Sequence, residues 1–135
     1  MTKQRNDNHS TEFGLWTRNQ PELDSSLGFI ASDIDWFWGD YISNNYLFME
    51  EKRFMAEPEI WQIKIFRKIH HRFIGQEKYY GFHIIQFENT NPDDGAIFIS
   101  HLDLPDSKRE IDRFQLIKFL RFEIYFKNGI YYLKS

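Results

Sequence analysis

Two acidic residues and a Glu-Glu-Lys triplet occur in the first half of the chain, on segments that otherwise have the composition of buried strands. Asp33 and Asp35 open an aromatic run. Further along, the triplet Glu50-Glu51-Lys52 follows the apolar segment Tyr46–Met49. Buried charges are costly unless they pair or hold a metal. These residues are therefore expected either at exposed strand ends or in a functional site.

The spacing of these residues predicts that they converge. Alternate side chains of a strand share a face, so Asp33 and Asp35 point the same way, and so do Glu50 and Lys52. If the two strands form a hairpin, one aspartate meets Glu50 and Lys52 near the strand ends. Carboxylates are the ligands that Mg²⁺ or Mn²⁺ prefers, and a metal ion lowers the pKa of a bound water. A lysine beside it can orient that water or stabilise charge on a phosphate oxygen, so the pattern suits phosphodiester hydrolysis.

A helix is predicted directly after Lys52, because Pro58 is placed at a helix start and apolar residues recur at helical spacing up to Phe73. Gln62 lies on its inward face, near the N-terminus, where its amide needs a hydrogen-bonding partner and can reach the site. Basic side chains in this region are expected to contact the backbone of a nucleic acid. They are Arg53, Lys64, Arg67, Lys68, His71 and Arg72.

Asp35, Glu50-Glu51-Lys52 and the helix bearing Gln62 together resemble the PD-(D/E)XK nuclease superfamily, over residues 28–75. That superfamily includes restriction endonucleases, Holliday-junction resolvases and phage exonucleases. The resemblance implies an α/β fold with a central mixed β-sheet flanked by helices. It also implies cleavage of DNA that depends on Mg²⁺ or Mn²⁺, in a small protein of a phage or bacterium.

The resemblance also assigns roles. Asp35 and Glu50 would be metal ligands, Lys52 the catalytic lysine and Gln62 an accessory catalytic residue. Many members add an acid from the first helix, for which Glu12 is the candidate.

The assignment leaves alternatives open. Glu22 is a second candidate for the additional acid, and Asp33 competes with Asp35. The proline that usually precedes the first acid is replaced by Ile34. A parallel frame, Glu51-x-Arg53, lies on the opposite strand face and ranks lower because it lacks the lysine.

Three other interpretations fit the same residues. The acids can simply cap strand ends and pair with Lys52 and Arg53. The fold can be an inactive nuclease fold that binds a nucleic acid or a protein in a phage or defence system. Finally, aromatic strands such as IYYLK can pair edge to edge in a homodimer.

Composition and charge set the limits. A chain of 135 residues with 19% aromatics and no cysteine suits one globular domain without disulfides or thiolate zinc sites. We expect residues 1–10 to be flexible and 11–135 to form a single nuclease-like domain. The polar start lacks the apolar stretch of a signal peptide, and no apolar run is long enough to span a membrane, which favours the cytoplasm (the host's, if the protein is phage-encoded).

Charge is unevenly distributed along the chain, although the net charge is only -3. Residues 1–51 hold three Lys or Arg against nine Asp or Glu, whereas residues 52–78 hold seven against three. An acidic part beside a basic part suits a carboxylate metal site next to a surface that follows phosphates, although an ordinary solvated helix face is the simpler reading.

The predicted element order is α-β-β-α-β-β-α-β-β. The expected ranges are a helix over 11–19, strands over 28–37 and 46–54, a helix over 58–73, strands over 79–88 and 96–101, a helix over 107–121 opened by the capping box Ser107–Glu110, and a hairpin over 122–134 turning at Asn128-Gly129. Adjacent His70 and His71 are expected at the surface. His83 and His101 are expected to be packing residues.

Overall fold

The computed structural model describes residues 12, 16, 19–27 and 34–134. The chain divides into two units, residues 1–32 and 33–135. In the first unit, the 3-10 turns η1 (Pro21–Leu23) and η2 (Ser25–Leu27) follow one another. The N-terminal segment expected to be flexible, most of the helix expected over 11–19, and Asp33 all lie outside the described residues.

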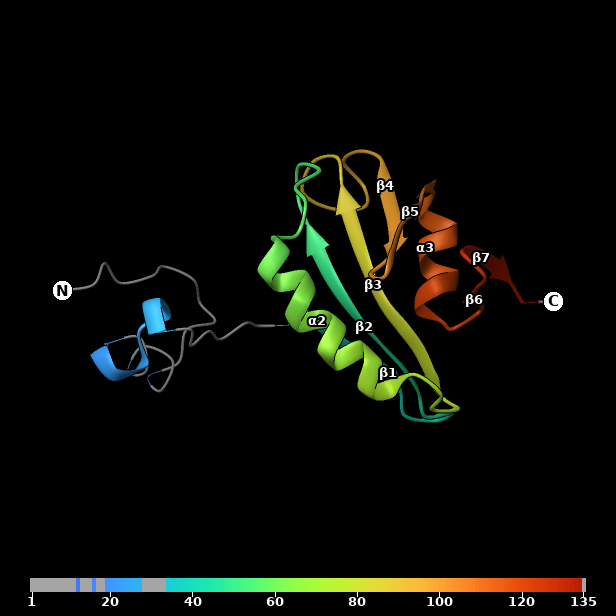
Figure 1. Cartoon of the computed structure of the whole chain (residues 1–135). Helices are drawn as coiled ribbons and strands as arrows, with labels where there is room; N and C mark the ends of the chain where they lie inside the picture. The colour runs from blue at the N-terminus through green and yellow to red at the C-terminus, as the bar shows by residue number, and fades with distance from the viewer. Residues whose placement is uncertain (1–11, 13–15, 17–18, 28–33, 135) are drawn as a thin grey trace. The chain divides into compact units, whose positions relative to one another are not determined.

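The second unit is built on a mixed five-stranded sheet in the order β1-β2-β3-β4-β5 (Figure 1). Its strands are β1 (Trp36–Asp40), β2 (Asn45–Lys52), β3 (Tyr79–Phe87), β4 (Ile97–His101) and β5 (Leu104–Ile111). Neighbouring strands run antiparallel except for β2 and β3, which are parallel and joined by helix α2 (Ile60–Phe73). The α/β class and the mixed sheet predicted from sequence are therefore confirmed.

Both faces of the sheet are covered. On one face, α2 packs through Phe66 against Phe48 and Phe82, and the rings of Phe66 and Phe82 stack at 4.8 Å. On the other face, helix α3 (Arg113–Leu120) and the hairpin of β6 (Ile124–Lys127) and β7 (Ile130–Leu133) enclose a second apolar core. Successive side chains of β2 point alternately into these two cores. Residues two apart on β2 therefore lie on the same face of the sheet and can belong to one site.

The first hairpin begins later than its sequence suggested. The predicted strand over 28–37 is observed as Trp36–Asp40, with residues 28–33 outside the described part, and the strand predicted over 46–54 ends at Lys52. Asn44 adopts a left-handed conformation, with φ of 63°, in the turn between the strands. Asparagine tolerates this conformation better than most residues, which fits the Asn-Asn signal in the sequence.

The prediction of a helix over 107–121 was wrong about where the helix begins. Residues 104–111 form strand β5, whose register pairs Ile97 with Ile111, and α3 begins only at Arg113. The cap is Asp112, whose side chain accepts the N–H of Gln115, while the Gln115 side chain accepts the N–H of Asp112. This second capping box competes with Ser107–Glu110, and pairing with β4 decides between them.

The C-terminal hairpin is confirmed as predicted. Asn128 and Gly129 both have positive φ angles, 53° and 82°, as a two-residue turn of the type favoured in hairpins requires. The hairpin forms its own two-stranded sheet and packs through buried Tyr131 on the α3 side of the molecule. Within the part of the chain that the structure describes, no helix is long and apolar enough to cross a membrane.

Candidate functional site

The structure brings Asp35 and Glu50 together where β1 begins and β2 ends. Trp36 pairs with Met49 in the antiparallel register, so Asp35, one residue earlier, lies opposite Glu50. The N–H of Asp35 donates to Glu50 Oε1 at 3.3 Å, and the N–H of Glu51 donates to Asp35 Oδ2 at 2.9 Å. Backbone pairing at the strand ends thus fixes the positions of both carboxylates.

Lys52 and Gln62 complete the cluster on the α2 face. Lys52 Nζ lies 3.6 Å from Glu50 Oε2 and donates to Gln62 Oε1 at 3.2 Å. The other end of the Gln62 amide donates to Glu50 Oε2 at 3.4 Å, and the N–H of Glu59 donates to Gln62 Oε1 at 2.9 Å. The sequence-based expectation that Gln62 reaches the strand residues from the first turn of the helix matches this geometry.

Glu50 is the electrostatic centre of the cluster. The residue is only 3% exposed, and its burial, followed by the hydrogen bond to Asp35 and the charge of Asp35, raises the pKa of Glu50 to about 8. Lys52 opposes the shift without cancelling it. A buried carboxyl whose pKa is shifted beside a second carboxyl and a lysine is a candidate functional group, because perturbed pKa values cluster at functional sites.

The connection from β2 to α2 is short and unusually shaped. Phe54 and Met55 both have φ of 56°, a left-handed conformation that costs energy for side chains of this size. Their N–H groups donate to the carbonyl oxygens of Asn89 and Phe87, at 2.9 Å each, which ties the turn to the end of β3. The strained turn directs the chain from Lys52 back over the sheet, so that the start of α2 faces the cluster.

Gln86 supports this turn and was not singled out from the sequence. It pairs with Lys52 in the parallel register, is 2% exposed, and donates from Nε2 to the carbonyl oxygen of Ala56 at 2.9 Å. The sequence did offer a signal for this residue, a single amide among the apolar residues of the segment His83–Phe87. An amide buried in such a strand needs a hydrogen-bonding partner.

The donor set suits a divalent cation. Mg²⁺ is usually held by one or two carboxylates and keeps several waters, and Asp35 with Glu50 supplies two. Repulsion between these carboxylates is one cause of the raised pKa of Glu50, and a cation would relieve it. Among the described residues no group of three or more His, Asp or Glu side chains converges as a ligand set.

Of the additional acidic ligands expected from sequence, two lie in the first unit and the third is outside the described residues. Glu12 and Glu22 belong to the first unit and are exposed. Asp33, the alternative to Asp35, lies outside the described residues. The role of Glu12 as a metal ligand therefore stays a prediction.

Substituting Glu50 with glutamine is expected to change how stability depends on pH. The pKa of Glu50 is higher in the folded protein than in the unfolded chain. The contribution of Glu50 to the free energy of unfolding is therefore fully present below its unfolded pKa and is lost as the pH rises through about 8. Between pH 5 and pH 9, the free energy of unfolding of the variant should therefore rise by about 3 kcal/mol relative to that of the wild type. Urea unfolding at the two pH values measures this.

The same unfolding experiment tests cation binding. Mg²⁺ should stabilise the wild type at pH 9, where Glu50 is ionised, and should have little effect on Glu50→Gln. Parallel pH profiles of the two proteins would contradict the electrostatic account of the cluster.

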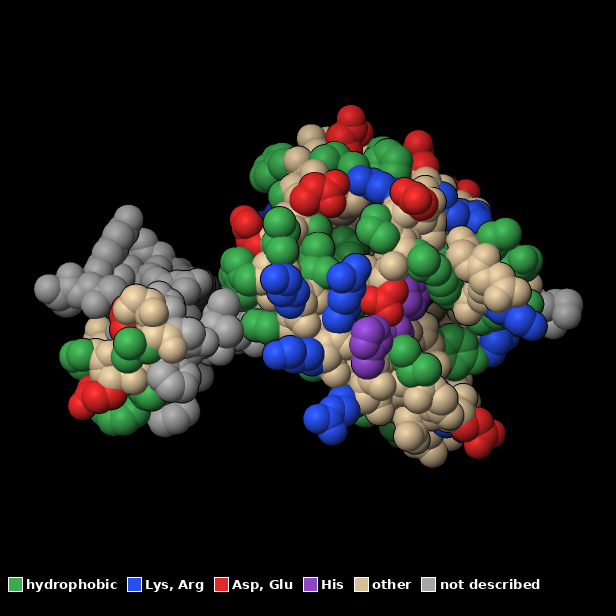
Figure 2. Space-filling model, in the orientation of Figure 1, with side chains coloured by type: hydrophobic (Ala, Val, Ile, Leu, Met, Phe, Trp, Pro, Cys, Tyr) green, Lys and Arg blue, Asp and Glu red, His purple; other side chains and the backbone are tan. Residues whose placement is uncertain are grey.

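Basic side chains gather on the outer face of α2 (Figure 2). Lys64, Lys68 and Arg72 follow one another at intervals of four residues, so they form one exposed row about 12 Å long. Arg67 and His71 form a second row, but both contact Asp103, through Arg67 Nε at 3.1 Å and His71 Nε2 at 3.0 Å. The first row therefore keeps its charges available, whereas the second is partly neutralised.

Arg53 does not join these rows. It lies with Glu51, Trp36 and Trp38 along a groove on the α3 side of the sheet. Trp36 Nε1 donates to Glu51 Oε1 at 3.0 Å, so the Glu51-x-Arg53 frame faces away from the carboxylate pair, as its position in the strand predicted. The contact between Arg53 and nucleic acid stays a prediction without support from the α2 surface.

The histidines divide differently from the prediction. His71 is exposed, but the expectation that His70 is also at the surface was wrong, because His70 follows Phe66 by one turn on the inward face and is 5% exposed. His70 Nδ1 contacts the Tyr79 hydroxyl at 2.6 Å. His83 and His101 are buried packing residues, as expected, with their rings 5.4 Å apart.

Comparison of the chain with protein-family models, with curated protein sequences and with solved structures gave no match.

Proposed function

We propose that this protein is a metal-dependent nuclease that hydrolyses DNA phosphodiester bonds at the Asp35–Glu50–Lys52–Gln62 cluster. The observation that carries the proposal is the meeting of two carboxylates, one of them buried, with a lysine and an amide on consecutive elements. The strand–helix–strand arrangement β2–α2–β3, with its parallel pair, supports a fold similar to that of restriction endonucleases.

The side chains divide the work as follows. Asp35 and Glu50 would hold Mg²⁺ or Mn²⁺, which supplies Lewis acidity and a bound water of lowered pKa. Lys52 orients the attacking water and stabilises negative charge on the phosphate oxygen. Gln62 holds the Lys52 ammonium in place through the 3.2 Å hydrogen bond. Lys64, Lys68 and Arg72 would bind the backbone of the nucleic acid beside the cluster.

A cleavage assay with the purified full chain tests the proposal. The substrates are linear duplex, circular, single-stranded and branched DNA, each incubated with Mg²⁺, with Mn²⁺ and with EDTA. We expect at least one substrate to be cut in the presence of metal and none in EDTA. The panel also identifies the DNA structure that is recognised.

An inactive binding module is the second candidate. The observation that favours it is that Glu50 Oε2 is already engaged by Lys52 and Gln62, which also contact each other. Folded protein that cuts no substrate, and that calorimetry finds not to bind Mg²⁺ or Mn²⁺, would overturn the nuclease. Binding of the same DNA panel in EDTA would then identify a module that recognises DNA without cutting it.

A further inference from the structure

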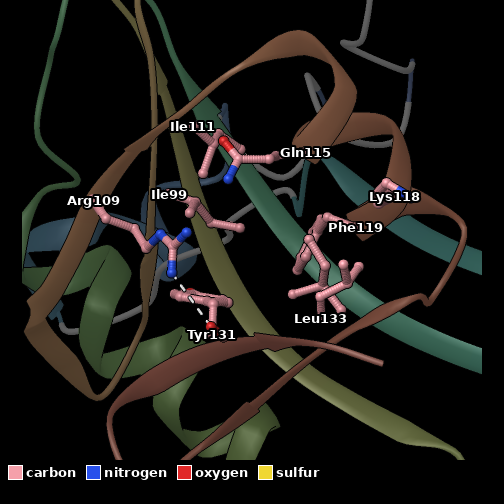
Figure 3. A pocket seen from close by; sticks show the side chains of 9 residues that line it. Ile99, Arg109, Ile111, Gln115, Lys118, Phe119, Tyr131 and Leu133 are labelled. Carbon is pink, nitrogen blue, oxygen red and sulfur yellow. Dashed lines mark hydrogen bonds between the residues drawn. The ribbon is translucent and has the colours of Figure 1, made fainter. Parts of the chain in front are cut away.

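A cavity of about 160 Å³ lies on the α3 side of the second unit, away from the face that carries the carboxylate pair (Figure 3). Strands β4 and β5, helix α3 and the C-terminal hairpin each contribute to its wall. The apolar lining consists of Ile99, Ile111, Phe119, Ile124, Tyr131 and Leu133. A cavity of about 150 Å³ in an apolar protein interior can take up a benzene-sized molecule, so this one has room for a single small ring.

Apart from the Tyr131 hydroxyl, which contacts His83 Nδ1 at 2.8 Å, the polar side chains that line this cavity carry N–H donors. They are Arg109, Gln115 and Lys118, and no acidic residue is among the lining residues that the structure describes. Gln115 Oε1 is occupied by the N–H of Asp112 at 2.8 Å, so the amide nitrogen is its free group. Figure 3 shows that nitrogen directed towards the space between the apolar walls.

Arg109 is held at the cavity wall. Its Nη1 donates to the carbonyl oxygen of Tyr131 at 3.3 Å, which leaves other guanidinium N–H groups for a second acceptor. Lys118, on α3, is exposed and lies 3.9 Å from Glu123, so it adds a partly neutralised positive charge near the opening. Guanidinium and amide donors beside an apolar cavity without an acid favour an anionic acceptor.

We propose that this cavity binds a small aromatic carboxylate. The ring fills the apolar space and the carboxylate accepts hydrogen bonds from Arg109 and Gln115. The charge and the size of the cavity both favour this class: a neutral ring gains no charge-assisted hydrogen bond from Arg109, and a cationic ring is repelled by Arg109. The inference uses none of the residues of the proposed nuclease site.

Calorimetry and two-dimensional NMR on the full chain test the proposal with three probes that share a phenyl ring and differ in charge: benzoate, benzamide and benzylammonium. We expect benzoate to bind with a dissociation constant on the order of 1 mM or below. Benzamide should bind at least about tenfold more weakly, and benzylammonium should not bind. Absence of benzoate binding, or equal binding of the three probes, overturns the proposal.

Three substitutions and one control variant locate the site. Gln115→Glu keeps the oxygen that caps α3 but replaces the free amide by a negative charge, so benzoate binding should fall at least about tenfold. Arg109→Gln should weaken it to a similar extent, whereas Arg113→Gln, on the same side of the molecule but outside the cavity, should not. Leu133→Trp, at a position 59% exposed, fills the opening without disturbing the core and should block binding. Unchanged affinity in folded Gln115→Glu and Leu133→Trp places the ligand elsewhere and overturns the assignment.

Discussion

Replacing Lys52 with alanine is expected to lower metal-dependent cleavage of DNA by about 10²- to 10⁴-fold, the range of a single acid–base or charge-stabilising group. The lysine lies 3.6 Å from Glu50 and 3.2 Å from Gln62, at the point where the two carboxylates meet the first turn of α2. Glu50→Ala should lose at least as much activity, because it removes one of the two carboxylates available to the metal. Initial rates under single-turnover conditions measure both effects.

The chain provides a matched control on the same strand. Glu51→Ala and Arg53→Ala remove the same kinds of charge one position further along, but these side chains line the groove on the α3 side of the sheet. At saturating DNA concentration both variants should retain cleavage within a few-fold of the wild type, because the contact between Arg53 and nucleic acid that the sequence predicts would affect DNA binding and not the cleavage rate. If both pairs of variants lose activity equally, the cause is damage to β2 rather than loss of a site, and the assignment of Glu50 and Lys52 fails.

Acid is expected to unfold the second unit through its buried histidines. Burial is the main cause that lowers the pKa of His83 to about 3 and of His101 to about 4. The positive charge of His101 lowers the pKa of His83 further, and that of His70 lowers the pKa of His101. A histidine with a lowered pKa contributes stability that is fully present above its unfolded value, near 6.5, and is lost as pH falls towards the folded value. The combined loss between pH 6.5 and pH 4 is on the order of 5 kcal/mol, a large share of the stability of a domain.

Urea unfolding from pH 7.5 to pH 4 tests this expectation. The wild type should lose stability steeply below pH 6.5. His101→Gln should flatten the slope because glutamine does not take up a proton in this range. Its amide oxygen can still accept the N–H of Asp103, which donates to His101 Nδ1 at 3.1 Å. His71→Gln, at the exposed position on α2, serves as the control. If the free energy of unfolding of the wild type does not change across this range, protonation of the buried histidines does not destabilise the folded state, and the prediction is wrong.

The two pH effects act in opposite directions. Glu50 favours the folded state at low pH and destabilises it as pH rises through about 8, whereas His83 and His101 destabilise it in acid. Maximum stability is therefore expected between the two ranges, near neutral pH. A divalent cation would extend the range upwards by favouring ionised Glu50.

Local sequence signals determined several elements by themselves. Asn128-Gly129 specified the C-terminal turn, because few other residues adopt two successive left-handed conformations without strain. Helical spacing from Gln62 to Phe73 specified which face of α2 packs on the sheet, and strand alternation placed Glu50 and Lys52 on one side. The turn, the helix face and the strand face depend only on the geometry of residues close together in the chain, so they can be read from the sequence.

Other features were decided only by tertiary structure. Ser107–Glu110 and Asp112–Gln115 both have the chemistry of a helix start, and the long-range pairing of Ile111 with Ile97 on β4 selects the second. His70 is buried by the β4–β5 side of the molecule, where its ring meets that of His101 at 4.9 Å. The raised pKa of Glu50 likewise needs Asp35 and α2 around it.

The sequence by itself thus determined which residues share a face, a turn or a helix start, since these follow from the bonded geometry of neighbours. It named Asp35, Glu50, Lys52 and Gln62 as a set. Only the tertiary structure decided how deeply Glu50 is buried, which basic side chains of α2 pair with Asp103, and that a cavity lined by donors opens beside the C-terminal hairpin. Burial and cavity shape arise from segments far apart in the chain, and no local pattern encodes the distance between them.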